Sequence, residues 1–131
     1  MRSFKCLVML LALGCLGCGS ATYGDLGRVS GKVTLDGQPL PNAQVCFQPS
    51  QGRPSFGMTD SNGNYELVYT ATSQGAAIGT HSVHLTTATD ADGNPKPELV
   101  PANYRGEKSE LRHEVSAGDN KIDLELTSAS S

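Results

Sequence analysis

Two short stretches place oxygen-bearing side chains at alternate positions, which is the spacing that calcium-binding loops use. The first carries Asp60, Asn62 and Asn64, and the second spans 90–94 with the sequence Asp-Ala-Asp-Gly-Asn. A calcium loop needs Gly at the sixth place and a bidentate Glu at the twelfth. The first stretch instead has its Gly at the fourth place and Ala71 at the twelfth. We therefore interpret both stretches as tight turns, because Asp and Asn bond readily to their own backbone.

The histidines offer a second kind of metal or acid–base chemistry. His81 and His84 lie three residues apart in the segment 80–86, whose alternation predicts a strand. Residues three apart are neighbours on a helix, but on a strand they point to opposite faces. We therefore predict no zinc site from this pair. His81, in phase with Val83 and Leu85, takes the place of an aromatic residue, and His84 lies on the surface.

Only one cysteine, Cys46, lies in the body of the chain, because Cys6, Cys15 and Cys18 lie in or beside an N-terminal apolar stretch. A single body cysteine cannot build a disulfide framework. Alternation turns Cys46 away from the face that its neighbours bury. We interpret it as a small, half-buried residue of a sheet, since thiol reactivity needs an electropositive neighbourhood that the sequence does not show. Pairing with a cysteine of another chain remains the alternative.

Short alternating segments predict the strands that position these residues. Val33, Val45, Phe47 and their apolar counterparts further along recur at every second position, and Gly, Pro, Asn and Asp punctuate the runs. The predicted strands are 29–35, 43–47, 56–59, 65–69, 80–86, 111–115 and 121–127. We expect the first two to form a hairpin-like unit, the loop 87–101 to cross between sheets, and 117–120 to be a tight turn. The core should then comprise Val33, Val45, Phe47, Leu67, Val83 and Leu124, between two sheets.

The pattern of the N-terminal residues predicts an export signal. Arg2 and Lys5 precede an apolar run, 6–13, which is too short to cross a bilayer. Two Leu-Gly-Cys sequences follow, ending at Cys15 and Cys18, and each resembles the bacterial lipoprotein box, in which the cysteine is acylated and becomes the mature N-terminus. We predict a signal peptide over 1–17, acylation of Cys18 (with Cys15 as the alternative), and a tether over 18–27. Cleavage with release of an unlipidated protein is the other outcome.

Composition excludes further classes of function. The net charge is −3, and it becomes −5 when Arg2 and Lys5 leave with the leader. An acidic domain without a Lys/Arg cluster is a poor binder of nucleic acid, and the absence of Trp with few other aromatics argues against a base-stacking platform. We expect no cofactor and no metal. The expected location is the cell membrane or outer membrane, facing the periplasm or exterior, with an envelope protein or polysaccharide as a possible partner.

The motifs together resemble the carboxypeptidase regulatory-like (transthyretin-like) domain, in the form of short exported lipoproteins of the planctomycete type. The resemblance rests on residues spread over the whole body: Val29, Gly31, Val33, Asp36-Gly37, Pro39, Pro41, Ala43, Val45, Phe47, Thr59-Asp60, Gly63, Tyr65, Gly75 and Gly79. The resemblance implies a seven-stranded Greek-key β-sandwich over 28–127. From the residues themselves we expect 128–131 to be a frayed tail. The sequence departs from the family at Ile78 and His81, where Pro and an aromatic residue are common. The resemblance carries no catalytic residues, and the chain has no H-x-x-E pair to hold the zinc of a peptidase.

We therefore predict a non-catalytic, membrane-anchored extracytoplasmic module with a structural or interaction role. One alternative is carbohydrate binding, for which Tyr23, Tyr69 or Phe56 would supply the flat ring. A second is hydrolysis of the transthyretin-related type, which Tyr104-Arg105-Gly106 resembles, although that family's terminal motif is internal here and its early His is missing. An internal Lys isopeptide is disfavoured, because Lys32 alternates outward from Val33.

Overall fold

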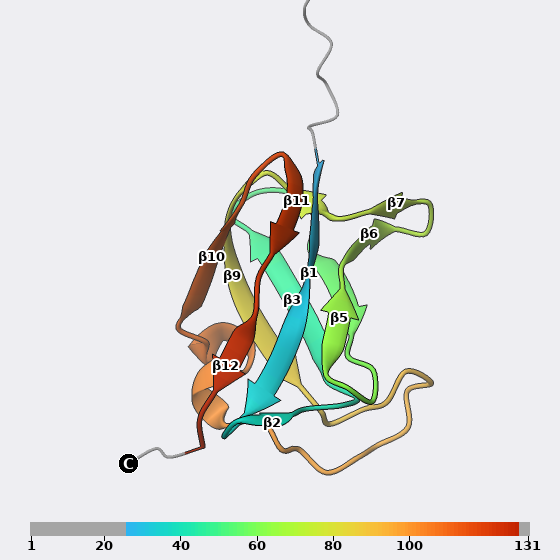
Figure 1. Ribbon diagram of the computed structural model, residues 1–131, viewed down its shortest axis with the longest axis vertical. Coiled ribbons are helices and arrows are strands. Elements are labelled where there is room, and N and C mark those ends of the chain that lie inside the picture. Colours follow the sequence, from blue (N-terminus) through green and yellow to red (C-terminus); the bar gives the residue numbers. More distant parts are fainter. Residues whose placement is uncertain (1–25, 129–131) are drawn as a thin grey trace, which may run out of the picture.

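The protein is an all-β sandwich, as the sequence predicts. A computed structural model describes residues 26–128, so the predicted signal peptide, Cys15, Cys18 and residues 129–131 lie outside the described part. Two six-stranded sheets face each other across a single apolar core (Figure 1). Within residues 26–128 there is no helix whose length and hydropathy would let it span a bilayer.

The first sheet is organised around its longest strand, β1 (Leu26–Leu35). On one side β5 (Asn64–Glu66) pairs with it antiparallel, and on the other β11 (Gly118–Lys121) and β12 (Leu124–Leu126) pair with it in parallel. Two-residue strands, β2 (Gln38–Pro39) and β8 (Ala76–Ala77), add further antiparallel pairing to the two ends of β1. The N-terminal and C-terminal strands of the body thus lie side by side (Figure 1).

The second sheet has the order β10-β9-β3-β4-β6-β7, and every pair in it is antiparallel. Its strands are β3 (Gln44–Pro49), β4 (Ser55–Met58), β6 (Val68–Thr70), β7 (Ser73–Gln74), β9 (Gly79–Thr86) and β10 (Leu111–Val115). Strands β3 and β4 are consecutive, the chain then passes through β5 of the first sheet into β6, which pairs with β4, and β9 returns to lie beside β3. That arrangement is a Greek key.

The seven predicted strands correspond to seven paths through the two sheets. Only Leu67 separates β5 from β6, so one extended segment pairs first with β1 and then with β4. In the same way β11 and β12 form one path, which is interrupted at Ile122 and Asp123. The remaining short strands, β2, β7 and β8, are local additions of two residues each.

The six residues predicted to form the core are all inside, with between 0 and 1% of their surface exposed. They belong to a larger apolar cluster that both sheets contribute: Val29, Val33, Leu40, Ala43, Val45, Phe47, Tyr65, Leu67, Ala76, Val83, Leu85, Val100, Val115, Leu124 and Leu126. Tyr104, predicted to dock against the sandwich, packs on this cluster from the 3-10 turn η2 (Ala102–Tyr104).

Three predictions about connections are wrong. The predicted strands 29–35 and 43–47 do not form a hairpin, because β1 and β3 lie in opposite sheets and only the short β2 pairs back onto β1. The loop 87–101 does not cross between sheets, since it leads from β9 to β10, which are neighbours in one sheet. Residues 118–120, predicted as a turn, are strand, because β11 pairs in parallel with the start of β1.

Glu98 organises the loop 87–101 from within. Its carboxylate accepts hydrogen bonds from the Thr86 hydroxyl (2.5 Å), from the Thr87 backbone N–H (2.8 Å) and hydroxyl (3.1 Å), and from the Val100 N–H (3.2 Å). Partial burial by itself would raise the pKa of Glu98, but these hydrogen bonds outweigh it and lower the pKa below the ordinary value. The ionised carboxylate therefore serves as the anchor of a loop that has almost no regular structure of its own.

Candidate functional site

The two oxygen-rich stretches are turns in the structure, as predicted. Asp60 Oδ1 accepts hydrogen bonds from the backbone N–H groups of Asn62 and Asn64, both at 2.9 Å. Asp90 Oδ1 does the same for the N–H groups two and four residues further on. Each of these two carboxylates thus stabilises the turn in which it lies. Within residues 26–128, no three His, Cys, Asp or Glu side chains come together in a group able to hold a metal ion.

His81 lies in the core with 1% of its surface exposed, in the aromatic position that the sequence predicts. Its ring centroid is 5.6 Å from that of Phe47, and Phe47 also stacks on His113, at 6.4 Å. His113 is directly opposite His81 on β10. The Nε2 atom of His81 lies 2.6 Å from the Ala77 carbonyl oxygen, and a carbonyl only accepts, so Nε2 carries the proton. Its Nδ1 atom is buried without a hydrogen-bond partner. The ring is thus a packed part of the interior.

His84 lies on the opposite face of the same strand, partly exposed, as predicted, and it is directly across from Cys46 on β3. Burial raises the pKa of the Cys46 thiol to about 11 and lowers the pKa of the His84 imidazole below its ordinary value. Both groups are therefore uncharged at neutral pH, and this pair does not form the thiolate–imidazolium couple of a cysteine nucleophile. Cys46 is more deeply buried than the half-buried position we predict, with 4% of its surface exposed.

These two residues are part of a row that crosses four strands on the outer face of the second sheet. Cys46 is also opposite Phe56 on β4, and Phe56 is opposite Val68 on β6. Directly opposite residues of an antiparallel pair point to the same face. We call His84, Cys46, Phe56 and Val68 the outer row. Phe56 and Val68 are exposed over 44% and 42% of their surface, although their strands lie inside the sheet and not at its edge.

A hollow of about 360 Å³ lies at the His84 end of the outer row. Gln48 and Ser82, which face each other across β3 and β9, line it together with His84. Glu107 also lines it, from the 3-10 turn η3 (Gly106–Lys108). The Ser82 hydroxyl accepts a hydrogen bond from Arg112 Nη1 (3.3 Å), which leaves its own hydrogen free to donate.

Of the aromatic residues proposed as sugar platforms, Phe56 has an exposed ring in the structure. The Tyr69 ring is covered by the Arg53 guanidinium, whose Cζ lies 5.4 Å from the ring centroid. Tyr23 lies outside the described residues. Neither Val68 nor the polar residues of the hollow were predicted to join Phe56, because the strand register that brings them together is not visible in the sequence.

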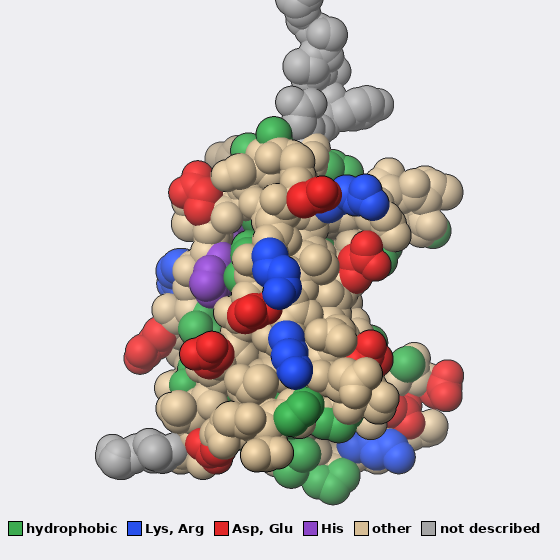
Figure 2. All heavy atoms as spheres, in the orientation of Figure 1, with side chains coloured by type: hydrophobic (Ala, Val, Ile, Leu, Met, Phe, Trp, Pro, Cys, Tyr) green, Lys and Arg blue, Asp and Glu red, His purple; other side chains and the backbone are tan. Residues whose placement is uncertain are grey.

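The outer face of the first sheet differs in character. It carries charged side chains of both signs over β1, β5 and β11 (Figure 2), among them Arg28, Lys32, Glu66 and Asp119. Lys32 is exposed, as predicted. A smaller hollow there, of about 130 Å³, is lined by Arg28, Glu66 and Asp119 with their neighbours.

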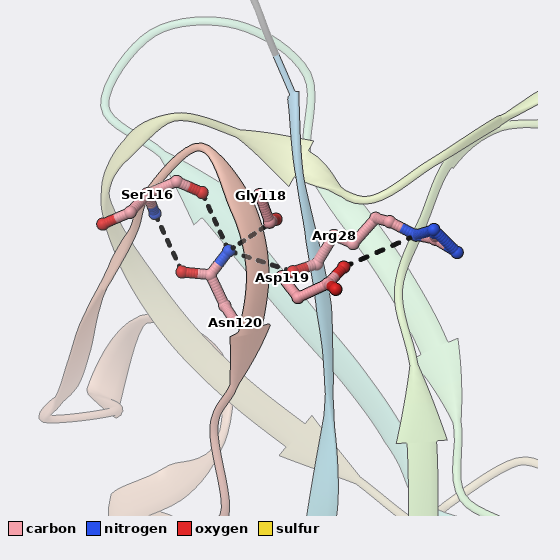
Figure 3. A network of polar contacts seen from close by, with 5 residues as sticks. All are labelled: Arg28, Ser116, Gly118, Asp119 and Asn120. Atoms are coloured by element: carbon pink, nitrogen blue, oxygen red, sulfur yellow. Dashed lines mark hydrogen bonds and ion pairs between the residues drawn. The ribbon is translucent and has the colours of Figure 1, made fainter.

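Beside that hollow a polar network joins the turn before β11 to β1 (Figure 3). Asn120 Nδ2 donates to the carbonyl oxygens of Ser116 (2.8 Å), Arg28 (2.9 Å) and Gly118 (3.3 Å), and Oδ1 accepts from the Ser116 N–H (2.9 Å). Arg28 Nε and Asp119 Oδ1 are 3.9 Å apart, and both side chains are largely solvated. This network fixes parallel pairing between distant parts of the chain, so we assign it a structural role.

The motif Tyr104-Arg105-Gly106 forms the junction of η2 and η3. The Tyr104 hydroxyl contacts the Thr127 hydroxyl (3.4 Å) and accepts from the Thr127 N–H (3.2 Å). Ser128, expected in the frayed tail, donates through its N–H and its hydroxyl to the Asp36 carboxylate (2.9 and 2.5 Å). Tyr104 thus helps to bind the segment that follows β12 to the sandwich.

No protein-family model matches the sequence, and no curated protein matches it. Among solved structures, the fold is similar to that of a DUF3823 family protein from Parabacteroides merdae ATCC 43184, with a TM-score of 0.44 and 17% sequence identity. The similarity covers 79% of this chain and 47% of that chain, so this sequence spans about half the length of its structural neighbour. The likeness is one between β-rich folds.

Proposed function

We propose that this protein is an exported, lipid-anchored and non-catalytic β-sandwich module that binds a partner at the cell envelope. The observation that carries the proposal is the outer row, where the apolar pair Phe56 and Val68 is exposed in the middle of a sheet. An apolar centre with polar side chains around it is the composition of a surface that meets a partner. Chance exposure of single apolar residues, as at Leu99, needs no such explanation.

The anchor is supported by the sequence that precedes the sandwich. A basic start, an apolar run and a Leu-Gly-Cys sequence ending at Cys18 resemble a lipoprotein leader. Strand β1 begins at Leu26, so a short segment, 19–25, would connect an acylated Cys18 to the folded body. Two or more acyl chains are needed for stable membrane attachment, and lipoprotein acylation supplies them. Such a protein would face the periplasm or the exterior.

A non-catalytic role is supported by the way the reactive groups of the sandwich are used. The Cys46 thiol stays protonated because burial raises its pKa to about 11. His81 bonds to the Ala77 carbonyl, and the Tyr65 hydroxyl donates to the Ile122 carbonyl (2.6 Å). These groups hold the fold together. The resemblance to carboxypeptidase regulatory-like lipoproteins, which implies no catalytic residues, agrees with this role.

Detergent partition of the expressed full-length protein tests the anchor. We expect the protein in the detergent phase, Cys18→Ala in the aqueous phase, and Cys15→Ala, the matched control, still in the detergent phase. Wild-type protein found only in the aqueous phase would contradict the anchor. A shift caused by Cys15→Ala alone would move the acylation to Cys15.

Site-specific crosslinking in cells tests the binding face. A benzophenone amino acid, which inserts into C–H bonds of proteins and polysaccharides, replaces Phe56 on the outer row or Lys32 on the first sheet. Both positions are exposed, so both probes reach solvent. We expect crosslinked material from position 56 and little from position 32. Equal yields at the two positions, or none at either, would contradict the proposal that this face binds a partner.

A further inference from the structure

The outer row and its hollow are rich in groups that both donate and accept hydrogen bonds. Gln48, Ser82 and His84 each have this double capacity, which is also the hydrogen-bonding character of a sugar hydroxyl. The Ser82 hydroxyl is already oriented by Arg112, so its hydrogen is directed away from that donor. A carboxylate, Glu107, adds one strong acceptor at the rim of the hollow.

The row itself carries no charge at neutral pH. Cys46 is protonated and buried, Phe56 and Val68 are apolar, and His84 favours its neutral form because it is partly buried. The first sheet, in contrast, presents Arg28, Lys32, Glu66 and Asp119. A strongly charged ligand would find compensating charges on the first sheet and none on the four residues of the outer row, so the row itself suits an uncharged ligand. Charged side chains lie at its His84 end, where Glu107 lines the hollow and Arg112 bonds to Ser82.

The geometry of the sheet sets the size of that ligand. Strands lie about 4.8 Å apart, so the outer row spans roughly 14 Å from His84 to Val68. Phe56 provides an exposed aromatic side chain near the middle, and the hollow of about 360 Å³ lies at one end. A chain of flat, apolar-faced rings with hydroxyls around their edges matches a platform followed by a polar pocket.

We infer that the outer row and its hollow bind a neutral, unbranched oligosaccharide, with one sugar ring stacked on Phe56 and the hydroxyls of another ring of the same chain in the hollow formed by Gln48, Ser82, His84 and Glu107. This inference rests on the proposed function and names the chemistry of the partner. Binding involves no bond making or breaking.

The test is a titration of the full chain, purified in an amine-oxide detergent so that no glycosidic detergent competes. The ligands are neutral hexasaccharides of cellulose, xylan, mannan and amylose, with hexagalacturonate as the charged counterpart, and calorimetry gives each Kd. At least one neutral hexasaccharide should bind, and more tightly than hexagalacturonate. Failure of all four neutral ligands to bind, or equal affinity for hexagalacturonate, overturns the inference.

Variants of Phe56 separate stacking from general apolar contact. Phe56→Ala should weaken binding about tenfold, and Phe56→Leu, which keeps most of the apolar area but loses the flat ring, should weaken it nearly as much. Leu99→Ala removes an apolar side chain that is even more exposed than Phe56 but is not part of the row, and it should leave the Kd unchanged. Unchanged affinity in Phe56→Leu would overturn the stacking geometry.

The two proposals fail in different ways. If position 56 crosslinks to a protein and no neutral hexasaccharide binds, the proposed function is supported and the oligosaccharide inference is wrong. Oligosaccharide binding by a protein that partitions into the aqueous phase would support the ligand and contradict the anchor.

Discussion

Thr59 tests whether hydrogen bonding or apolar burial stabilises the connection from β2 in the first sheet to β3 in the second. Its side chain is buried with 4% of its surface exposed, between the segment that follows β2 and the end of β4. The hydroxyl donates to the Leu40 carbonyl oxygen (2.7 Å) and accepts from the Ala43 N–H (2.8 Å). Both of those residues are buried as well, with 3% and 0% of their surface exposed. Thr59 thus satisfies two backbone groups that water cannot reach.

The substitution Thr59→Val keeps the shape of the side chain and removes both hydrogen bonds. Each buried backbone group left without a partner costs about 1–3 kcal/mol, so the loss of two partners should lower the free energy of unfolding by about 2–6 kcal/mol. For a domain of this size, such a loss lowers Tm by roughly 10–25 °C. Thr59→Ser is the matched control, because it keeps the hydroxyl and deletes one buried methyl group, at a cost of about 1 kcal/mol.

Urea unfolding followed by circular dichroism measures both free energies, and an unchanged slope with denaturant shows that the same surface is exposed in each variant. We expect the stability order wild type, Thr59→Ser, Thr59→Val. Apolar burial alone predicts the reverse order of the two variants, because Val is the more hydrophobic replacement. If Thr59→Val is as stable as Thr59→Ser, our reasoning about these hydrogen bonds is wrong.

Three further predictions concern acid stability and backbone packing. Burial lowers the pKa of His113 below 6.5, so the unfolded chain binds a proton at this residue more readily than the folded chain does. The urea midpoint of unfolding should therefore fall as the pH drops below about 6.5. The fall should be less steep in the variant His113→Phe. Because the pKa of Glu98 is lowered in the folded protein, its carboxylate stabilises the fold above the ordinary pKa of 4.5, and this stabilisation is lost as the pH falls through the pKa of the folded state. Glu98→Gln should remove this pH dependence and speed hydrogen exchange of the backbone amides that bind the carboxylate. A Cβ at Gly31 would lie 1.9 Å from the Ile122 carbonyl oxygen, so Gly31→Ala should lower the free energy of unfolding by more than about 3 kcal/mol. Gly37 has open space around it, so Gly37→Ala should lower the free energy of unfolding by only about 1 kcal/mol. Thermal melts of the two variants measure the difference.

Each of these predictions has an outcome that contradicts it. A urea midpoint in His113→Phe with the same pH dependence as the wild type would show that this histidine does not titrate on unfolding. Slow exchange preserved in Glu98→Gln would show that the loop is held without the carboxylate. Equal melting temperatures for the two glycine variants would contradict the close approach of Gly31 to the Ile122 carbonyl oxygen.

The candidate site shows where prediction from the sequence ends. Alternation identifies the outward side of β3, and Cys46, although buried, is not part of the apolar cluster between the sheets. The neighbours of Cys46 depend on register, which sets it between His84 and Phe56. Register follows from turn geometry and from the fit of both apolar faces at once, and a shift of two residues would preserve every inward-facing side chain. The sequence therefore predicts the faces of strands better than the rows that cross them.

The sequence by itself determined most of the strands, their buried faces, the six core residues and the turns at Asp60 and Asp90, because each depends on side chains a few positions apart. Only the tertiary structure decided that β1 and β3 lie in opposite sheets and that β11 runs parallel to β1. These pairings join segments as far apart as Arg28 and Asp119, and the hydrogen bonds of a sheet form between backbones, whose chemistry is nearly the same at every residue. A local pattern cannot specify which backbone its strand will meet, so that choice rests with the packing of the whole chain.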